Sequence, residues 1–514
     1  MPTWAIVLVA VLGFLLLVVV HDLTQRRHAI LRNFPIVGHF RYLLEKVGPE
    51  LRQYIVTSNN EERPFSRDQR RWVYASSKRE NAYFGFGTDE DLELSPSYLI
   101  LKHAAFPHPE PPAGSAAGDP GYALPCAKVL GGWRGRPGAF RPTSIVNVSA
   151  MSYGALSARA VEAINRGCGL ASALHNTGEG GIAPAHAHGG ELVWQLGTGY
   201  FGARDERGRF SEERFVESLG RARVRAIEVK LSQGAKPGLG GVLPAAKVTP
   251  EIAAIRGIPV GQTCHSPAAH PEFDDVEGLI DFVERLSDLS GGLPVGIKSA
   301  VGELAFWEQL ANAMLGSGRG PDFVTIDGGE GGTGAGPLVF TDHVALPFKV
   351  GFSRVYRAFA ERGLAEQVVF VGSGKLGFPE QAALAFVLGC DLVNVAREAM
   401  LAIGCIQAQR CHTGHCPTGV ATQSRWLMHG LDPTLKSARL ANYLVALRRD
   451  LLHVANACGA AHPALLGPEH VEILDGHFGS VPVDRVFDYE PGWGKPTLVE
   501  QETIAAIMRG EISA

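Results

Sequence analysis

The sequence has few cysteines and no excess of positive charge. Its eight cysteines in 514 residues are scattered apart from one short cluster, which argues against a disulfide framework and fits a reducing compartment. The net charge of -4 and the pI near 6.5 provide no basic surface, and no stretch interleaves aromatic with basic residues. These shortages exclude a disulfide-stapled secreted domain and argue against nucleic acid as a partner.

Charge is also missing from one long stretch near the N-terminus. Residues 4–20, WAIVLVAVLGFLLLVVV, are apolar throughout and are about long enough to cross a bilayer as a helix. Arg26 and Arg27 follow this run, and positive residues beside a span favour the cytoplasmic side. We predict a single-pass inner-membrane anchor over residues 1–30 with a cytoplasmic catalytic body. A cleaved signal peptide, which would need basic residues before the run, and a buried core helix are the alternatives.

Residues 31–120 mix helical and loop patterns. An amphipathic helical pattern comes first, and a charged surface connection follows it. A Pro/Gly-rich loop, HPEPPAGSAAGDPGYALP, then marks a soft boundary. We predict an N-terminal helical and loop region over 31–120, a main domain over 121–430 and a C-terminal helical extension over 431–514.

The main domain repeats one pattern, in which a short β-branched run ends in a small or polar residue and a helical stretch follows. Strands that alternate with helices form parallel sheets, and eight such units over about 250 residues fit a closed (β/α)8 barrel. The fold class predicted is therefore α/β, a TIM barrel. The eight runs span 145–151, 170–176, 226–232, 258–264, 293–299, 322–328, 367–373 and 391–396.

Glycine-rich turns follow several of the predicted strands, at the end of the barrel where catalytic residues gather. One of them, IDGGEGGTGAGP, contains a GxGxxG pattern, but Pro337 and an apolar run stand where a dinucleotide-binding helix should begin. Close backbone approach to a flat ring or to substrate explains these glycines better. The turn GSGKLG, after the seventh strand, is suited to a phosphate group. A single glycine-rich turn can also be only a turn.

Two basic positions call for an anionic partner. Lys298 ends an apolar strand, so its ammonium should point into the barrel mouth, where an unpaired charge is costly. An anionic reduced flavin would supply the partner. Arg256 and Lys236 could bind a carboxylate, because guanidinium pairs with carboxylate through two hydrogen bonds. Structural salt bridges are the alternative for these residues.

Cys405, Cys411 and Cys416 lie within twelve positions of one another and are followed by Pro417. Thiolates are soft ligands that suit iron-sulfur clusters or zinc. His412 and His415 lie between the cysteines, so a mixed zinc site stays open, and buried small hydrophobic residues are the non-metal alternative.

Six ordered motifs and the cysteine spacing resemble the FMN-binding synthase domain of glutamate synthases, in their stand-alone archaeal-type form. The motifs are SAMSYGALS, NTGEGG, VKLSQGAKPGLGG, IKSAVG, GGEGGTGAGP and the run from Cys405 to Gln423. The resemblance implies an FMN-containing barrel with a 3Fe-4S cluster on Cys405, Cys411 and Cys416. It also implies that 2-oxoglutarate and ammonia form 2-iminoglutarate, which reduced FMN converts to L-glutamate.

The resemblance also implies roles for individual residues. Those expected around the flavin are Ser149, Met151, Ser152, Lys298, Gly328, Gly329, Gly372 and Gly374. Those expected around the oxo acid are Glu179, Gln233, Lys236 and Arg256.

Departures from the family pattern bear on the partners. The first cysteine is Cys126 and an apolar span stands ahead of it, so we expect neither a glutaminase nucleophile before the barrel nor an FAD or NADPH domain after the cysteine cluster. We therefore expect ammonia to be free or to come from a partner. Electrons would come from a ferredoxin or an NAD(P)H-oxidising subunit. The alternatives are another FMN/iron-sulfur oxidoreductase, resembling 2-hydroxy acid oxidases or membrane electron-chain enzymes, and a non-catalytic electron-transfer subunit.

Overall fold

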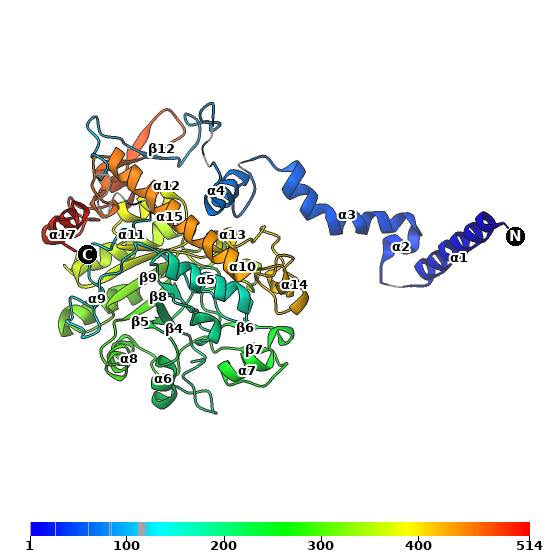
Figure 1. Ribbon diagram of the computed structural model, residues 1–514, viewed down its shortest axis with the longest axis horizontal. Helices are drawn as coiled ribbons and strands as arrows, with labels where there is room; N and C mark the ends of the chain where they lie inside the picture. The colour runs from blue at the N-terminus through cyan, green and yellow to red at the C-terminus, as the bar shows by residue number, and fades with distance from the viewer. Residues whose placement is uncertain are drawn as a thin grey trace. The chain divides into compact units, whose positions relative to one another are not determined.

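The computed structural model describes residues 2–25, 27–59, 61–81, 83, 85–111, 119 and 121–513 (Figure 1). The chain divides into two compact units, Met1–Arg71 and Trp72–Ala514. Arg26 and part of the predicted Pro/Gly-rich loop, 112–118 and 120, lie outside the described residues. The divisions expected at residues 30, 120 and 430 stay predictions.

The first unit begins with α1 (Thr3–Thr24), a helix of 22 residues whose most apolar window has a mean hydropathy of 3.0. By length and composition, α1 could cross a membrane. Two further helices follow, α2 (Ala29–Asn33) and α3 (Val37–Leu51), and a π-helical turn, Arg52–Val56, continues α3. A fourth helix, α4 (Arg67–Lys78), leads into the second unit.

The second unit is built around a closed barrel of eight parallel strands, which confirms the predicted α/β barrel. The order around the barrel is β10-β11-β2-β3-β4-β5-β8-β9. The first four strands are β2 (Val146–Val148), β3 (His175–Asn176), β4 (Leu192–Leu196) and β5 (Val224–Lys230). The other four are β8 (Val295–Ala300), β9 (Phe323–Asp327), β10 (Val369–Ser373) and β11 (Leu392–Val395).

One of the eight predicted strands is wrong. In the stretch 258–264 only Cys264 is in a strand, in β7 (Cys264–His265), which pairs with β6 (Val242–Leu243) outside the barrel. Val260 is 56% exposed, so its β-branched side chain faces solvent instead of the core. The missing barrel strand is β4, LVWQL, which lies between Gly190 and Gly197 and buries Leu192, Trp194 and Leu196.

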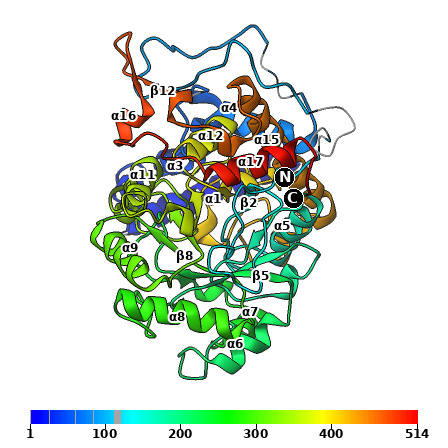
Figure 2. The same cartoon turned by 90° about the vertical axis from the view of Figure 1, so that its left-hand side faces the viewer.

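Helices cover the outside of the barrel, as the predicted alternation requires (Figure 1, Figure 2). Ser157, Ser211 and Asp275 cap the first turns of three of them by accepting backbone N–H bonds. The helices of this layer are α5 (Ala158–Leu170), α6 (Glu212–Leu219), α8 (Val276–Leu289), α9 (Ala305–Ser317), α11 (Phe348–Ala360), α12 (Pro379–Val387) and α13 (Arg397–Ala402). Shorter helices in the loops are α7 (Pro250–Arg256), α10 (Leu338–His343) and α14 (Arg425–His429).

The C-terminal part packs on this layer. Its long helix α15 (Pro433–Ala457) lies against α5, where a side chain at Gly167 would meet Leu440 at 2.9 Å. A three-stranded sheet, β1 (Leu99–Leu101), β12 (Val471–Leu474) and β13 (Ser480–Pro482), joins distant parts of the chain. The last helices are α16 (Val483–Phe487) and α17 (Leu498–Met508), and α17 buries Ile504 and Ile507.

A buried ion pair holds the amino ends of two barrel strands together. Asp322, which is 2% exposed, accepts bonds from Arg136 Nε at 3.1 and 3.2 Å and from the Val295 backbone N–H at 2.9 Å. Val295 begins β8, and Asp322 directly precedes β9. Arg136 also donates to both carboxylate oxygens of Glu284, at 2.6 and 2.9 Å, and the largely buried Arg134 lies 3.8 Å from Asp322. Asp322 is therefore the buried acceptor of a small charged group.

Replacing Asp322 by alanine should lower the free energy of unfolding by about 2 kcal/mol, because the buried Val295 N–H loses its acceptor and Arg134 loses its nearby carboxylate, whereas Arg136 keeps Glu284. The matched control is Asp281→Ala, which removes a surface pair with Arg319 whose aspartate side chain is 68% exposed. That change should cost less than about 1 kcal/mol. Urea unfolding followed by tryptophan fluorescence measures both, and equal losses would contradict the argument.

Candidate active site

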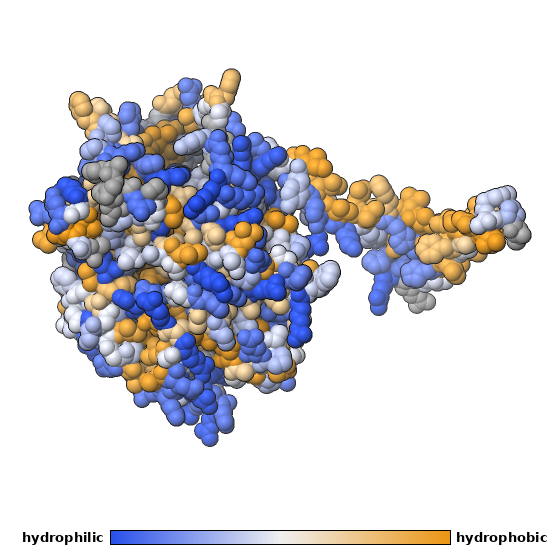
Figure 3. All heavy atoms as spheres, viewed as in Figure 1, coloured by the Kyte–Doolittle hydropathy of each residue, from blue (hydrophilic) through white to orange (hydrophobic). Residues whose placement is uncertain are grey.

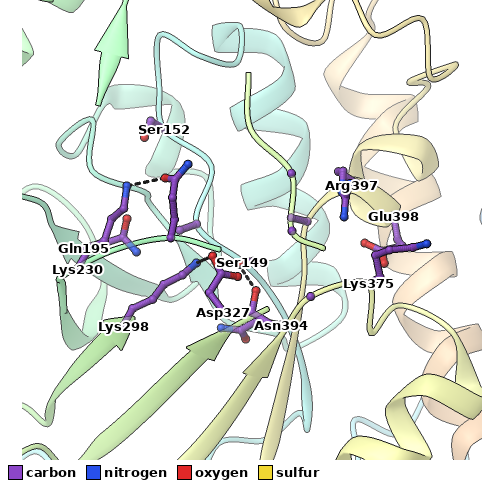
Figure 4. Close-up of a pocket in the computed structure, with 17 residues that line it drawn as sticks. Ser149, Ser152, Gln195, Lys230, Lys298, Asp327, Lys375, Asn394, Arg397 and Glu398 are labelled. Atoms are coloured by element: carbon purple, nitrogen blue, oxygen red, sulfur yellow. Dashed lines mark hydrogen bonds and ion pairs between the residues drawn. The ribbon is translucent and has the colours of Figure 1, made fainter. Parts of the chain in front are cut away.

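A cavity opens where the barrel strands end (Figure 4). Its walls come from β4, β5, β8, β9, β10 and β11 and from the loops that follow β2, β5, β9, β10 and β11. This is the barrel face where catalytic residues gather. The residues that line it are Ser149, Ala150, Ser152, Gln195, Lys230, Gln233, Lys298, Asp327, Gly331, Gly332, Ser373, Gly374, Lys375, Asn394, Ala396, Arg397 and Glu398.

Lys298 lies in the barrel mouth, where the sequence placed it. Its side chain is buried, and Nζ is 3.5 Å from Asp327 Oδ2. The same aspartate accepts a bond from the Gly234 backbone N–H at 2.9 Å, so the loop after β5 closes onto β9. A Cβ at Gly234 would lie 1.8 Å from the Gly328 carbonyl oxygen, so this approach requires glycine.

Behind the cavity wall, a buried carboxylate holds the side-chain amide of one lining residue, Gln195. Glu228, 1% exposed, accepts bonds from Gln195 Nε2 at 2.6 Å, Asn176 Nδ2 at 2.7 Å and Thr325 Oγ1 at 2.7 Å. A carboxylate only accepts hydrogen bonds, so the Gln195 nitrogen must face it. The Gln195 carbonyl oxygen is thereby left as an acceptor for a ligand in the cavity.

Two cationic side chains follow the seventh and eighth barrel strands. Lys375 comes after β10 and Arg397 begins α13 after β11, and Figure 4 shows both at the end of the cavity away from Lys298 and Gln195. Gly374, with φ of 138°, lets the chain turn beside them without a side chain. In barrel enzymes the loops after these two strands often bind phosphate.

The two glycines predicted near a phosphate take different positions. Gly374 lines the cavity, whereas Gly372 lies inside β10 and is absent from the lining. A side chain at Gly372 would meet Leu376 at 2.8 Å and Cys390 at 2.9 Å. Gly372 therefore serves close packing of the barrel wall.

Of the other residues expected around a flavin, some line the cavity and some do not. Ser149 and Ser152 line the cavity, and Ser149 Oγ lies 3.4 Å from Ser373 Oγ. Met151, Gly328 and Gly329 do not line it. Gly328 lies directly behind Gly374, where an added Cβ would be 3.3 Å from the Gly328 Cα.

A second group of charges surrounds Glu179. Lys230 Nζ is 3.2 Å from Glu179 Oε1 and donates to Gln233 Oε1 at 2.7 Å. Burial acts to raise the pKa of Glu179, but Lys230, Arg256 and Lys236 together hold it below its usual value. The structure thus gathers Gln233, Lys236 and Arg256 around Glu179, the fourth residue expected around the oxo acid. Gln233 and Lys230 also line the cavity.

Lys236 and Arg256 are both 5% exposed. Lys236 Nζ donates to the Gly240 carbonyl at 3.2 Å, and Arg256 Nη2 donates to the Tyr153 carbonyl at 2.9 Å. The Arg256 guanidinium lies over the Phe201 ring at 4.8 Å, and its buried Nε has no hydrogen-bond partner among the described residues. A buried donor without an acceptor is costly, so Arg256 is suited to receive an anion.

The cysteine loop lies beside the turn after β2. Gln423 Nε2 donates to the carbonyls of Gly154 at 3.0 Å and Leu156 at 2.9 Å. From another loop, Lys247 Nζ donates to the Cys411 carbonyl at 2.8 Å. A Cβ at Gly334, in the loop after β9, would be 3.9 Å from the Cys411 Cβ. The cysteines therefore belong to the same end of the barrel as the cavity.

The thiols of Cys411 and Cys416 differ in the surroundings that shift their pKa values. Burial raises the pKa of Cys411, and the nearby Cys416 sulfur adds to that rise. Burial also acts to raise the pKa of Cys416, but bonds from Ala421, Thr418 and Val420 hold it below its usual value, favouring the thiolate. No three His, Cys, Asp or Glu side chains in the described ranges are grouped as a metal site. The donor chemistry fits a soft metal centre, whereas the spacing of the side chains does not show one.

Several lining residues escaped the sequence reasoning, among them Gln195, Lys230, Lys375, Asn394 and Arg397. Gln195 was missed because its strand, β4, was missed. The others occupied quoted motifs or the ends of predicted strands, and a search for polar residues at every strand end would have found them.

Comparisons with known proteins agree with this geometry. The family model described as the conserved region in glutamate synthase matches residues 139–461. A glutamate synthase large subunit-like protein of Bacillus subtilis is 38% identical over 481 residues, 88% of this chain and 91% of that one. An archaeal glutamate synthase [NADPH] of Methanocaldococcus jannaschii is 35% identical over 316 residues, which are 61% of this chain and 59% of that protein. The chain therefore belongs to the glutamate synthase family.

Proposed function

We propose that this chain is a glutamate synthase-type oxidoreductase that binds FMN in the cavity and reductively aminates 2-oxoglutarate to L-glutamate. The observation that carries the proposal is a barrel-mouth cavity lined by cations at both ends, in a chain of this family. Lys298 and Lys230 lie at one end, and Lys375 and Arg397 lie at the other.

The lining fits FMN by its chemistry. Lys375, Arg397 and the turn at Gly374 offer cations and open backbone to a phosphate. Lys298 would supply a cation to the polar edge of the flavin ring, and the Gln195 carbonyl would supply a hydrogen-bond acceptor. Gly331 and Gly332 line the cavity without side chains that would fill it. When bound, FMN would collect two electrons and deliver them as a hydride.

The Glu179 group would hold the oxo acid. The cations of Lys236 and Arg256 match the two carboxylates of 2-oxoglutarate, and their burial excludes the water that would weaken each pairing. Glu179 would keep the neighbouring cations oriented through Lys230. Gln233, which accepts from Lys230, would connect this group to the cavity.

Electron supply and location are part of the same proposal. Cys405, Cys411 and Cys416 would hold a 3Fe-4S cluster, which passes single electrons. The donor would be a ferredoxin or an NAD(P)H-oxidising subunit, and ammonia would be free or come from a partner. Through α1 the protein would be anchored in the cytoplasmic membrane with its catalytic body in the cytoplasm.

One experiment tests the proposed reaction. The full chain is purified anaerobically, its absorption spectrum is recorded, and the reduced flavin is mixed with 2-oxoglutarate with and without ammonium. Reoxidation that requires both compounds and yields L-glutamate is expected. Reoxidation without ammonium would favour a different flavin oxidoreductase, and a protein without flavin would favour an electron-transfer subunit.

The affinity for the oxo acid should fall at alkaline pH. Burial and the charge of Lys230 lower the pKa of Lys236, against the opposing effect of Glu179. Lys236 therefore loses its proton at a lower pH than an ordinary lysine, and KM for 2-oxoglutarate should rise over the pH range just below the ordinary lysine pKa. Lys236→Arg keeps the cation and should abolish this rise. A KM in the parent chain that is flat over this range would contradict the role of Lys236.

A further inference from the structure

Helix α3 and the turn after it expose a continuous set of apolar side chains. Over residues 36–56 they recur at spacings of three and four, which places them on one side of a helix. Figure 3 shows apolar residues gathered along α1 and α3. The exposed members are Ile36, Val37, Phe40, Leu43, Leu44, Val47, Leu51, Tyr54, Ile55 and Val56, of which Val37, Ile55 and Val56 are about three-quarters exposed.

Contacts within the first unit use another part of α3. His39 Nε2 lies 2.9 Å from Asp22 Oδ2, and a Cβ at Gly38 would meet Leu31 Cδ2 at 3.0 Å. Asp22 also accepts the Ile36 backbone N–H at 3.0 Å, in a turn where Ile36 has φ of 63°. A β-branched residue rarely adopts that conformation, so these bonds hold the turn in one shape. The described residues of the first unit thus leave the apolar side of α3 exposed.

The same hydrogen bonds hold the start of α3 beside the last turn of α1. Asp22 stands in the last turn of α1, whose 22 residues span about 33 Å, close to the roughly 30 Å of a bilayer core. If α1 crosses the bilayer, Asp22 lies at its surface. His39 and Ile36 are bonded to Asp22, so the start of α3 lies at that surface as well.

We propose that α3 and the turn to Val56 lie flat in the membrane surface, with the apolar side inserted among the lipid acyl chains. This rests on the proposed membrane attachment through α1. A helix with one apolar and one polar side commonly binds in this way. Large exposed apolar patches mark surfaces that bind a membrane, a ligand or another protein.

The charges of α3 identify the lipid surface that fits. Arg41 pairs with Glu45 at 2.8 Å, and Lys46 and Glu50 balance one another in sign. The charges within α3 therefore cancel, and Arg52 in the turn leaves residues 37–56 with one positive charge. An uncharged phosphatidylcholine surface is thus sufficient, and added anionic lipid should strengthen the contact only slightly.

Lipid photolabelling of the full chain tests the inference. The protein is placed in phosphatidylcholine nanodiscs that contain a phosphatidylcholine with a photoreactive acyl chain, and labelled peptides are identified by mass spectrometry. Lipid adducts are expected on α1 and on peptides covering residues 37–56. Adducts on α1 alone would overturn this inference and leave the anchor standing, whereas adducts on neither would overturn both.

Two matched triple variants sharpen the test. Phe40→Ser, Leu44→Ser and Val47→Ser should remove the adducts from α3 and keep those on α1. Arg41→Gln, Glu45→Gln and Lys46→Gln, on the polar side, should keep both sets. Equal labelling of the two variants, or cross-links that join α3 of two copies while lipid adducts are missing, would overturn the proposal.

Discussion

Replacing Lys298 by methionine should slow reoxidation of the reduced flavin by 2-oxoglutarate and ammonium about 100- to 1000-fold. The ammonium is buried in the barrel mouth and its neighbouring anion, Asp327 at 3.5 Å, is held in place by the Gly234 N–H. A fixed cation in a site without water stabilises negative charge far more than it would in water. Methionine keeps the length of the side chain and removes that charge.

Stopped-flow absorbance on variants with matched flavin content measures this loss. Lys298→Arg, which keeps a cation, should recover part of the rate. The flavin spectrum and the melting temperature serve as controls for folding. A Lys298→Met chain that retains more than about half of the parent rate would contradict the electrostatic role.

Replacing Cys411 by serine should abolish the electron paramagnetic resonance signal of the proposed iron-sulfur cluster. A hydroxyl is a poor substitute for a thiolate, which is the ligand that iron prefers in such clusters. Cys411 is only partly exposed and its thiol is influenced by Cys416, so the two sulfurs share one environment. Transfer from a one-electron donor to the flavin should stop, whereas chemical reduction of the flavin should persist.

The control is Cys458→Ser, at the C-terminal end of α15 and outside the cysteine loop. It should keep the full signal and the iron content of the parent chain. A Cys411→Ser chain with an unchanged signal would show that the ligands were misassigned. Zinc in place of iron in the parent chain would instead support the mixed site with His412 or His415.

The barrel could be predicted because seven of its strands are apolar runs that end in small or polar residues. The run at 258–264 has the same composition, and nothing in its pattern indicates that it is not a barrel strand. LVWQL escaped because it is short and is closed by Gly190 and Gly197, as many loops are. Only the closure of the barrel, which needs exactly one strand between β3 and β5, distinguishes the two.

A site residue could be predicted from the sequence where the direction of its strand alone decides that it lies at the cavity end of the barrel. Lys298 reached the cavity because residues at the end of a parallel barrel strand all open onto one face. Gly372 did not, because alternate residues of a strand face opposite sides and it lies among Cys390 and Leu376. The bonds of Glu228 to Asn176, Gln195 and Thr325 depend on four strands and have no local signal.

The sheet arrangement also limits association between chains. All eight barrel strands have two neighbours, so the barrel offers no unpaired backbone to another strand. In the part of the chain that the structure describes, open edges belong only to strands of two or three residues, such as β1 and β13, and β13 ends in Pro482, which has no N–H to donate. The folded protein therefore offers few unpaired strand edges from which an amyloid-like sheet could grow.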